Sequence, residues 1–451
     1  MKTIIRNASI VNENKTFIGD VLINNNRIEK IGPSIELNNQ AVYQEINAEG
    51  LFLFPGIIDD QVHFREPGLT HKGTIYSESK AAVAGGVTSF MDMPNTIPNV
   101  LTQDLLAEKY AIAAHSSLAN YSFFMGINQY NLEEALKTCT ETVCGITDDG
   151  LYFNEGNGML VNHPEYLEKL FERSNTLIAL HSESDQIIEK NTKHFKSIYG
   201  DDIPIELHAE IRSEAACLTT TKAVIDLARS HAARLHLFHI STAAEALLLD
   251  NKNATREKLI TGEVCLHHLW FNSDDYQQLG ALIKWNPSIK SKENQLKLME
   301  AVKSIHIDFI ATDHAPHTFS EKQGNYFNAH SGGPLVQHLL PAMLAYYHKK
   351  ELSLERIVEL LCHNVADAYR IIDRGYIREG YFADLVLVDL SNQWHVSKDN
   401  LLYACNWSPF EGQNFESKVI KTFVNGNIVY DNGCVQENIK GKRLLFEKNR
   451  F

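Results

Sequence analysis

Apolar and polar positions alternate over short stretches in the first fifty-odd residues, a pattern typical of half-buried β-strands. The stretches with this alternation are 3–11, 20–24 and 27–31. No stretch with a helical period occurs before Pro55. We therefore expect residues 1–55 to contribute strands to a small β domain.

Short apolar runs alternate with amphipathic helical stretches over residues 56–369. The strand candidates are 56–60, 88–93, 121–125, 143–146, 177–180, 235–239, 260–266 and 309–312. The main helical stretches are 75–84, 103–114, 164–173, 211–230 and 292–302. Strands that alternate with helices in this way form parallel βαβ units. Eight of them predict an α/β fold of the (β/α)8 or TIM-like barrel type.

Short strands return after residue 370. Residues 381–389 are strongly apolar, and 421–430 read as a hairpin around Asn425-Gly426, a dipeptide that favours a type I′ turn. Strands at both ends of the chain flank the predicted barrel. We expect 1–55 and 370–451 to pack together as one small β-sandwich domain.

Composition narrows the classes of function. Lys and Arg number 42 against 56 Asp and Glu, a formal net charge of −14, which disfavours nucleic-acid binding through phosphate contacts. The seven cysteines are widely spaced and include no Cys-x-x-Cys, so a disulfide framework is not expected. The first residues lack the pattern of a signal peptide and no apolar run reaches about 18 residues, so we expect neither a secretory leader nor a membrane span. We predict a cytoplasmic enzyme with a small-molecule substrate, no membrane contact and a homodimeric state.

Several histidines follow strand candidates directly. His63, His181, His239 and the pair Asp313-His314 lie at or just after the carboxyl ends of four strands. In a barrel these ends meet on one face, where active sites lie. A single histidine is more often structural, but several in this register favour a metal site. Imidazole and carboxylate ligands favour zinc.

The segment 59–68 carries the most chemical information. Strand alternation places Asp59, Gln61 and His63 on one side, and Arg65 begins the loop that follows. A guanidinium beside a metal is suited to a substrate carboxylate, which it can bind with two parallel hydrogen bonds. The alternative is a solvated Arg on the protein surface.

Motifs in order along the whole chain identify a resemblance. They are His63-Phe-Arg-Glu-Pro-Gly68, Gly85-Gly-Val-Thr88, Met93-Pro-Asn-Thr96, His181-Ser-Glu183, His239-Ile-Ser-Thr242, Glu263-Val-Cys-Leu-His-His268, Asn286-Pro287, Ala311-Thr-Asp-His-Ala-Pro-His317 and Ala383-Asp-Leu-Val-Leu-Val-Asp389. With these motifs the chain resembles the bacterial zinc-type dihydroorotases of the amidohydrolase superfamily. Related hydantoinases lack the Arg at position 65, and allantoinases usually carry Asn there.

The resemblance implies a reaction and a set of site residues. The reaction is the zinc-dependent, reversible cyclisation of N-carbamoyl-L-aspartate to L-dihydroorotate in de novo pyrimidine biosynthesis, with one or two Zn²⁺ per subunit. Asp313 matches the family's proton-shuttling aspartate. The implied metal ligands are His63, Asp149, His181, His239 and Asp313, and the implied substrate-binding residues are Arg65, Asn95, Asn286 and His317.

Two positions depart from the family pattern. The family's first strand reads Asp-x-His-x-His, and Gln61 replaces the first of these histidines. Many relatives also place a carbamylated Lys on the fourth strand, where this chain has Thr147. A branch of bacterial relatives carries Thr-Asp-Asp-Gly instead, and Asp149 matches its bridging carboxylate. The alternative for Asp148-Asp149-Gly150 is an ordinary turn.

These departures keep two other functions open. One is a catalytically inactive relative that binds a partner enzyme of the same pathway, and the other is a different cyclic amidase such as a hydantoinase or allantoinase. Among the remaining motifs, His267-His268 read as structural, and 183–190 as a solvated helix start. Glu206, His208 and Glu210 read as a loop that leads into a helix, with a substrate-side role left open.

Overall fold

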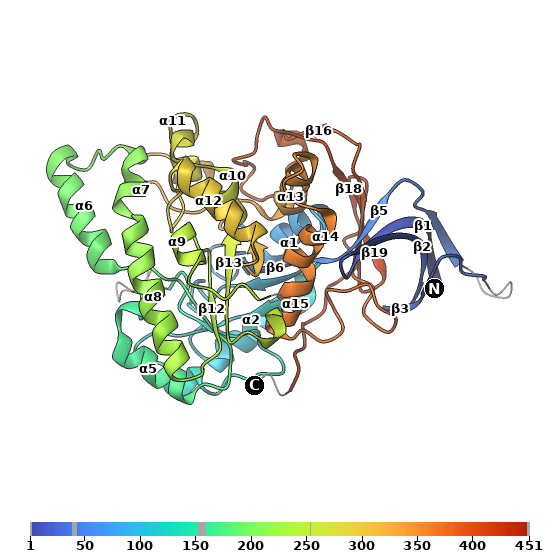
Figure 1. Cartoon of the computed structure of the whole chain (residues 1–451), viewed down its shortest axis with the longest axis horizontal. Coiled ribbons are helices and arrows are strands. Elements are labelled where there is room, and N and C mark those ends of the chain that lie inside the picture. Colours follow the sequence, from blue (N-terminus) through green and yellow to red (C-terminus); the bar gives the residue numbers. More distant parts are fainter. Residues whose placement is uncertain (1, 38–42, 152–158, 253, 449–451) are drawn as a thin grey trace.

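A parallel β-barrel surrounded by helices forms the centre of the computed structural model, which describes residues 2–37, 43–151, 159–252 and 254–448 (Figure 1). Its strands are β6 (Ile57–Val62), β7 (Val87–Asp92), β8 (Asn120–Phe123), β9 (Met125–Gly126), β10 (Ile146–Thr147), β11 (Ile178–Leu180), β12 (Leu235–Leu237), β13 (Ile260–Cys265) and β14 (Phe309–Ala311). They form a three-stranded and a six-stranded sheet, in the orders β6-β7-β8 and β14-β13-β12-β11-β10-β9.

The two sheets close into one barrel. Phe124 separates β8 from β9, so these are two parts of one strand that pairs with β7 on one side and β10 on the other. At the opposite seam Val62 and His314 form a parallel bridge, and His63 N donates to His314 O at 2.7 Å. Eight strands result, in agreement with the predicted (β/α)8 fold.

Helices cover the outside of the barrel (Figure 1). Their bounds are α1 (Ile75–Ala84), α2 (Gln103–Ser116), α3 (Leu132–Ala135), α5 (Pro164–Arg173), α6 (Asp185–Tyr199), α7 (His208–Ile211), α8 (Glu214–Ser230), α9 (Ala243–Ala246), α10 (Leu266–Trp270), α11 (Tyr276–Leu279), α12 (Lys292–Lys303), α13 (Leu339–His348), α14 (Leu354–Val358) and α15 (Asn364–Tyr369). None of the helices in the described part of the chain has both the length and the apolar composition needed to cross a bilayer.

Two predicted elements differ from the structure. The fourth strand was placed at 143–146, but β10 is the two-residue segment Ile146–Thr147, since residues 139–143 turn back on themselves through Val143 N to Cys139 O. The helix predicted at 211–230 is split, because Arg212 leaves the helical backbone (φ −97°, ψ 65°) and Ser213 is the extended N-cap of α8. This break directs Arg212 toward the barrel mouth.

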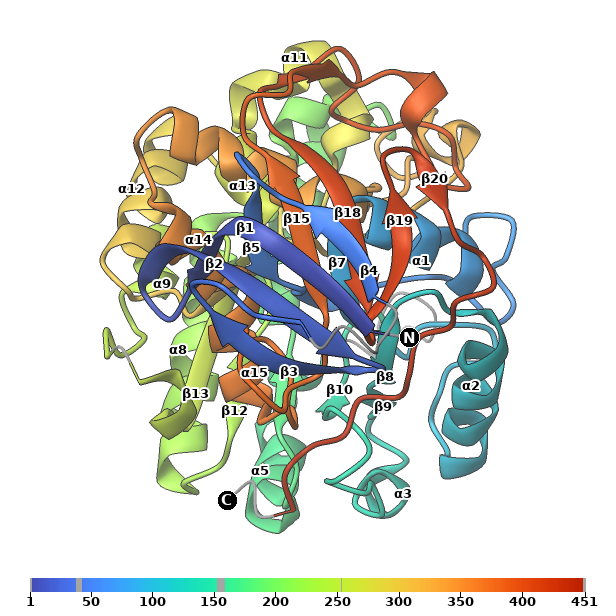
Figure 2. The ribbon, with the colours of Figure 1, turned by 90° about the vertical axis from the view of Figure 1, so that its right-hand side faces the viewer.

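Strands from both ends of the chain share one nine-stranded sheet (Figure 2). Its members are β1 (Lys2–Asn12), β2 (Lys15–Asn24), β3 (Arg27–Gly32), β4 (Tyr43–Asn47), β5 (Phe52–Pro55), β15 (Leu385–Asp389), β18 (Lys418–Val424), β19 (Asn427–Asp431) and β20 (Cys434–Val435). The antiparallel pairing of β5 with β15 joins the two ends, as predicted. The Asn425-Gly426 hairpin is also present, with positive φ at both residues (49° and 77°). A two-layer sandwich stays a prediction. Strands β16 (Trp394–His395) and β17 (Asn414–Phe415) form a separate pair.

The last described residues leave this sheet and run along the barrel (Figure 2). Tyr121 N donates to Lys442 O at 3.0 Å, and Leu444 N donates to Tyr121 O at 2.9 Å. Leu444 and Phe446 are buried in an apolar cluster with Tyr369 of α15. The division into 1–55, 56–369 and 370–451 stays a prediction, and this tail is a part of the third segment that contacts the barrel.

Candidate metal and anion site

A cavity of about 470 Å³ opens at the carboxyl ends of the barrel strands. The predicted substrate-binding residues that line it are Arg65, Asn95, Asn286 and His317, and the predicted metal ligands that line it are His63, Asp149 and Asp313. His181 and His239 are buried beside Asp149. The structure therefore brings all the predicted site residues to one place, although they come from seven different strand ends or loops.

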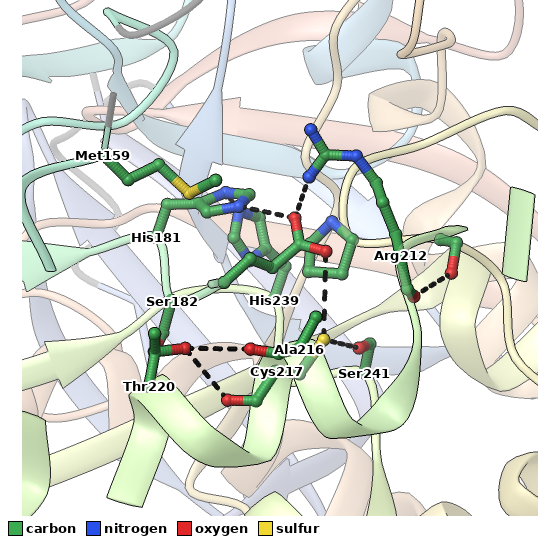
Figure 3. A network of polar contacts seen from close by, with 12 residues as sticks. Met159, His181, Ser182, Arg212, Ala216, Cys217, Thr220, His239 and Ser241 are labelled. Atoms are coloured by element: carbon green, nitrogen blue, oxygen red, sulfur yellow. Dashed lines mark hydrogen bonds and ion pairs between the residues drawn. The ribbon is translucent and has the colours of Figure 1, made fainter. Parts of the chain in front are cut away.

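His181, His239 and Asp149 form the tightest group of possible metal ligands. His181 Nδ1 lies 2.9 Å from His239 Nε2, and both nitrogens lie 3.7 Å from Asp149 Oδ1. Figure 3 shows the two rings together at the ends of their strands. Two imidazoles and one carboxylate, with ligand atoms all within 4.8 Å of one another, match the donor types that bind zinc.

Glu183 fixes the orientation of the His181 ring through its Nε2, the nitrogen that does not face His239. The His181 Nε2–H donates to Glu183 Oε2 at 2.8 Å, so that Nδ1 is the nitrogen that faces His239 and Asp149. Arg212 forms an ion pair with the same carboxylate, and the two approach it from different sides (Figure 3). Burial alone would raise the pKa of Glu183, but the Arg212 charge and the His181 hydrogen bond hold it well below its ordinary value.

The prediction of a solvated helix start at 183–190 is confirmed for α6, which has no buried residue, but it was wrong for Glu183. Glu183 is fully buried, and helix α6 begins only at Asp185, with Ser184 as its N-cap. The burial depends on Arg212, which follows 29 residues later in the chain. The position of Glu183 two residues after a strand-end histidine was the one local signal of its role.

His63 lies on the other side of Asp149. Its Nδ1–H donates to Asn95 Oδ1 at 2.8 Å, and its Nε2 lies 3.0 Å from Asp313 Oδ1 and 3.4 Å from Asp149 Oδ2. Asp149 thus stands between two pairs of possible ligands. One pair is His181 with His239, and the other is His63 with Asp313.

Left-handed backbone conformations turn several of these side chains into the cavity. Arg65, His239 and Asp313 have φ values of 71°, 35° and 46°, which non-glycine residues seldom adopt. Gly150, the residue after Asp149, has φ 74° and packs so closely that a Cβ there would lie 2.2 Å from Asn95 Nδ2. Residues 148–150 therefore form a turn, and this turn also places Asp149 in the cavity lining.

The carboxylates that contact His63 and His181 create a strongly negative electrostatic potential at the candidate metal ligands. Burial alone would lower the pKa of His63 and of His181, but hydrogen bonds to Asp149 and to a second carboxylate raise the pKa of each to about 9. Carboxylates that favour protons on these imidazoles also favour a divalent cation in place of the protons. The donor set and its field therefore fit a metal ion.

Gln61 enters the same group from β6. Its Nε2 donates to Asp149 Oδ2 at 3.1 Å, and its Oε1 accepts from Cys265 Sγ at 3.3 Å. All three residues are buried. The carboxamide that replaces an imidazole of the family pattern is thus a hydrogen-bond donor to Asp149.

Basic groups also line the cavity. Arg65 Nε donates to Pro316 O at 3.0 Å, and an Arg65 Nη2 lies 3.2 Å from His317 Nε2. Lys72 Nζ lies 3.1 Å from His317 Nδ1 and is paired with Glu321 at 3.0 Å. Within the described residues Arg65 has no carboxylate ion-pair partner within 4 Å, although it is only 6% exposed.

Other polar groups near the cavity are held by the protein itself. Lys284 Nζ donates to the carbonyl groups of Tyr326 and Ala329, and Lys322 Nζ to those of His330 and Gly332. These bonds fasten the segment 321–332 as one wall of the cavity. Asn286 Oδ1, in contrast, is buried without a hydrogen-bond partner and belongs to the lining of the cavity.

Other histidines have structural contacts. His314 Nε2 donates to the buried Glu78 at 2.8 Å and its Nδ1 accepts from Leu335 N, so only Asp313 of the Asp313-His314 pair enters the cavity. His267 and His268 are buried in α10, a short helix where a strand end was expected. His208, in α7, is bonded to Tyr326 Oη and Trp285 O at the cavity wall.

A second buried group lies deeper in the barrel. His236 Nε2 is 3.4 Å from Glu263 Oε2 and 3.6 Å from Asp60 Oδ2, and Tyr369 donates to Asp60 at 2.8 Å. Burial raises the pKa of Glu263 to about 8 and that of Asp60 well above its ordinary value. Burial in this Asp60 group therefore favours the neutral form of both carboxyl groups.

Comparison with known proteins places the whole arrangement in one family. The model of the amidohydrolase family matches residues 52–429. The chain is 33% identical over 434 residues to a dihydroorotase of Wolbachia sp. subsp. Drosophila simulans (94% of each chain). It is 30% identical over 463 residues to an allantoinase of Solibacter usitatus (99% of this chain, 98% of the other).

Solved structures show the same fold at lower identity. An L-hydantoinase (dihydropyrimidinase) from Arthrobacter aurescens superposes with a TM-score of 0.88 at 24% identity, over 98% of this chain and 99% of that one. A dihydropyrimidinase from Brevibacillus agri has a TM-score of 0.87 at 24% identity, over 99% and 98%. With a family match across most of its length, this chain belongs to the amidohydrolase family.

Proposed function

We propose that this protein, a cyclic-amide hydrolase of the amidohydrolase family, is a dihydroorotase that interconverts L-dihydroorotate and N-carbamoyl-L-aspartate. The observation that carries the proposal is the buried Arg65 in the cavity lining, which has no carboxylate ion-pair partner within 4 Å among the described residues. A buried cation without a counter-charge is costly, and an anionic ligand removes that cost. Dihydroorotate is a cyclic amide with such a carboxylate.

The carboxylate would bind Arg65, Asn95 and His317. Arg65 Nη groups offer two parallel donors, and the side-chain amide of Asn95 faces the same cavity. His317 lies against Arg65 and Lys72, whose positive charges support an anion next to them. A ring without a carboxylate would leave Arg65 without a carboxylate partner.

The metal-binding group supplies the second half of the proposal. We assign His63, Asp149, His181, His239 and Asp313 to a cluster that binds Zn²⁺. When bound by these residues, a zinc ion would supply a water molecule of lowered pKa and a Lewis acid for the carbonyl of the ring amide.

Asp313 is the residue we assign to proton transfer. Its carboxylate enters the cavity at the strand end and is held 3.0 Å from His63 Nε2. In ring opening it would accept a proton from the attacking water and deliver it to the departing ring nitrogen, and the same steps run backwards in ring closure. The unpartnered Asn286 Oδ1 is placed to accept a hydrogen bond from a ring N–H.

Another cyclic amidase activity is the alternative, since an allantoinase is among the relatives. The direct test is absorbance-followed hydrolysis by the zinc-supplemented protein of L-dihydroorotate and of dihydrouracil, the same ring without the carboxylate. We expect turnover of dihydroorotate to exceed that of dihydrouracil, hydantoin and allantoin. Faster turnover of a ring without a carboxylate would refute the proposal, and no turnover of any ring would favour an inactive partner-binding protein.

The KM for dihydroorotate is expected to change by less than about threefold between pH 6.5 and 9. Burial and the charges of Arg65 and Lys72 hold the pKa of His317 well below its ordinary value, so His317 stays neutral in this range. Burial lowers the pKa of Arg65 to about 10, so Arg65 stays charged until the pH approaches that value. Initial-rate kinetics over this range test the prediction. A KM that follows a titration near pH 6.5 would contradict it.

Glu183→Gln is expected to weaken zinc binding by about 10–100-fold, since the amide no longer holds His181 as a carboxylate does. Equilibrium dialysis against buffered zinc measures the effect. The matched control is Glu245→Gln, an equally buried Glu that bonds Thr221 and Thr242 and contacts no candidate ligand. Equal zinc affinities for the two variants would show that Glu183 does not support the metal site.

The cytoplasmic location and the homodimer stay predictions.

A further inference from the structure

Gln61 cannot offer a ligand atom to the metal group in the orientation that its neighbours impose. Its Nε2 faces Asp149 Oδ2, and an amide nitrogen that carries two protons is a donor only. Its Oε1 faces Cys265 Sγ, away from the carboxylate. Rotation of the amide by 180° would place oxygen against oxygen at Asp149 and replace an N–H donor there by a repulsive contact. The carboxamide is therefore locked as a donor.

The hydrogen bond from Gln61 distinguishes the two oxygens of Asp149. Oδ2 accepts from Gln61 at 3.1 Å and also lies 3.4 Å from His63. Oδ1 lies 3.7 Å from the ring nitrogens of both His181 and His239. The oxygen on the His63 side is thus partly satisfied by the protein, while the other oxygen points at two imidazoles.

The two sides of Asp149 also differ in how many ligands they hold. The His181 and His239 side makes a complete set of three with Asp149. On the other side, His63 and Asp313 belong to no set of three His, Cys, Asp or Glu side chains whose ligand atoms lie within 4.8 Å of one another, within the described residues. That side also lacks a second imidazole, because residue 61 is Gln.

We propose that, of the five residues assigned above to the Zn²⁺ cluster, only Asp149, His181 and His239 bind a metal ion, one per chain, and that Gln61 positions Asp149 in place of a second ion. His63 and Asp313 then remain bonded to each other beside the ion, on the substrate side. This inference rests on the zinc dependence in the proposed function and fixes its stoichiometry.

Metal content of the purified protein tests the number directly. After incubation with excess Zn²⁺ and desalting, we expect one zinc per chain by elemental analysis. Gln61→His restores a second imidazole on the His63 side and is expected to raise the content to two. Gln295→His is the matched control, because it makes the same exchange in α12 at a Gln that is bonded to Asn272 and Leu269, outside both groups of candidate metal ligands, and its content should stay at one.

Removal of single ligands separates the two sides. His181→Ala is expected to lose the ion, while His63→Ala is expected to keep one zinc per chain. Two zinc ions in the unaltered protein, or equal losses in both variants, would overturn the proposal.

A spectroscopic measurement on the unaltered protein avoids any dependence on variants that fold poorly. With Mn²⁺ in place of zinc, electron paramagnetic resonance should show an isolated ion, and the multiline signal of a spin-coupled pair would refute the inference. Activity is read separately. One ion without turnover of dihydroorotate would leave the stoichiometry intact and reject the proposed function, whereas turnover with two ions would do the reverse.

Discussion

Asp313→Asn is expected to lower kcat for ring opening of dihydroorotate by about 10³–10⁴-fold, the upper range for loss of a positioned general base. The amide is nearly isosteric and can keep a contact with His63, 3.0 Å away, but it cannot accept a proton from water. The zinc content should stay at one per chain, because Asp313 lies outside the Asp149, His181 and His239 set. Initial rates with saturating dihydroorotate, measured in parallel with metal analysis, give both values.

The two readouts separate catalysis from metal loss. A fall in activity that follows a fall in bound zinc would make Asp313 a ligand and leave the base unassigned. Activity within tenfold of the unaltered protein would show that another group transfers the proton. The thermal midpoint of unfolding serves as the control for structural damage.

Arg65→Ala is expected to reduce kcat/KM for dihydroorotate by about 10³-fold, equivalent to about 4 kcal/mol, within the range for loss of one partner of a buried charge pair. Turnover of dihydrouracil should fall far less, because that ring has no carboxylate for Arg65 to bind. The ratio of the two specificity constants is therefore the decisive measurement. Arg65→Lys should restore only part of the difference, since an ammonium cannot make two parallel bonds.

The matched control for this change is Arg173→Ala. Arg173 forms an exposed ion pair with Glu133, and such pairs contribute little. Its kinetics should be unchanged. An equal loss for both rings in Arg65→Ala would mean that Arg65 supports the loop through Pro316 and does not select the substrate.

Much of the fold could be predicted from the sequence because local patterns of apolar and turn-forming residues determine its strands and turns. Apolar runs of strand length marked the barrel strands, and Asn425-Gly426 marked a hairpin whose turn needs two residues with positive φ. The fourth strand was misplaced since only Ile146 and Thr147 pair with both neighbours, in a segment too short for any period. The break before α8 was missed because it serves a distant contact of Arg212.

Site residues could be predicted where motif residues follow strands. They could not be predicted where contacts between residues distant in the sequence determine the burial of a side chain. His63, His181 and Asp313 end strands, so their convergence follows from barrel geometry. Glu183 looked solvated, since nothing near it in the chain shows that Arg212 would neutralise it. Lys284 and Lys322 are also buried through long-range contacts, because backbone carbonyl groups of the cavity wall accept hydrogen bonds from their ammonium groups. Their surroundings exist only in the folded chain.

The tail around residues 442–446 packs against the barrel, and it is synthesised after all the barrel strands. Leu444 and Phe446 are buried in one apolar cluster with Tyr369 and with barrel residues such as Ile58 and Phe309, which are synthesised more than a hundred residues earlier. While the chain is on the ribosome, the barrel segment emerges before the tail, so the apolar side chains of this cluster are still exposed. They become covered only when the tail is released. Nascent chains halted before residue 440 should therefore remain sensitive to protease and dependent on chaperones, even with all barrel strands complete.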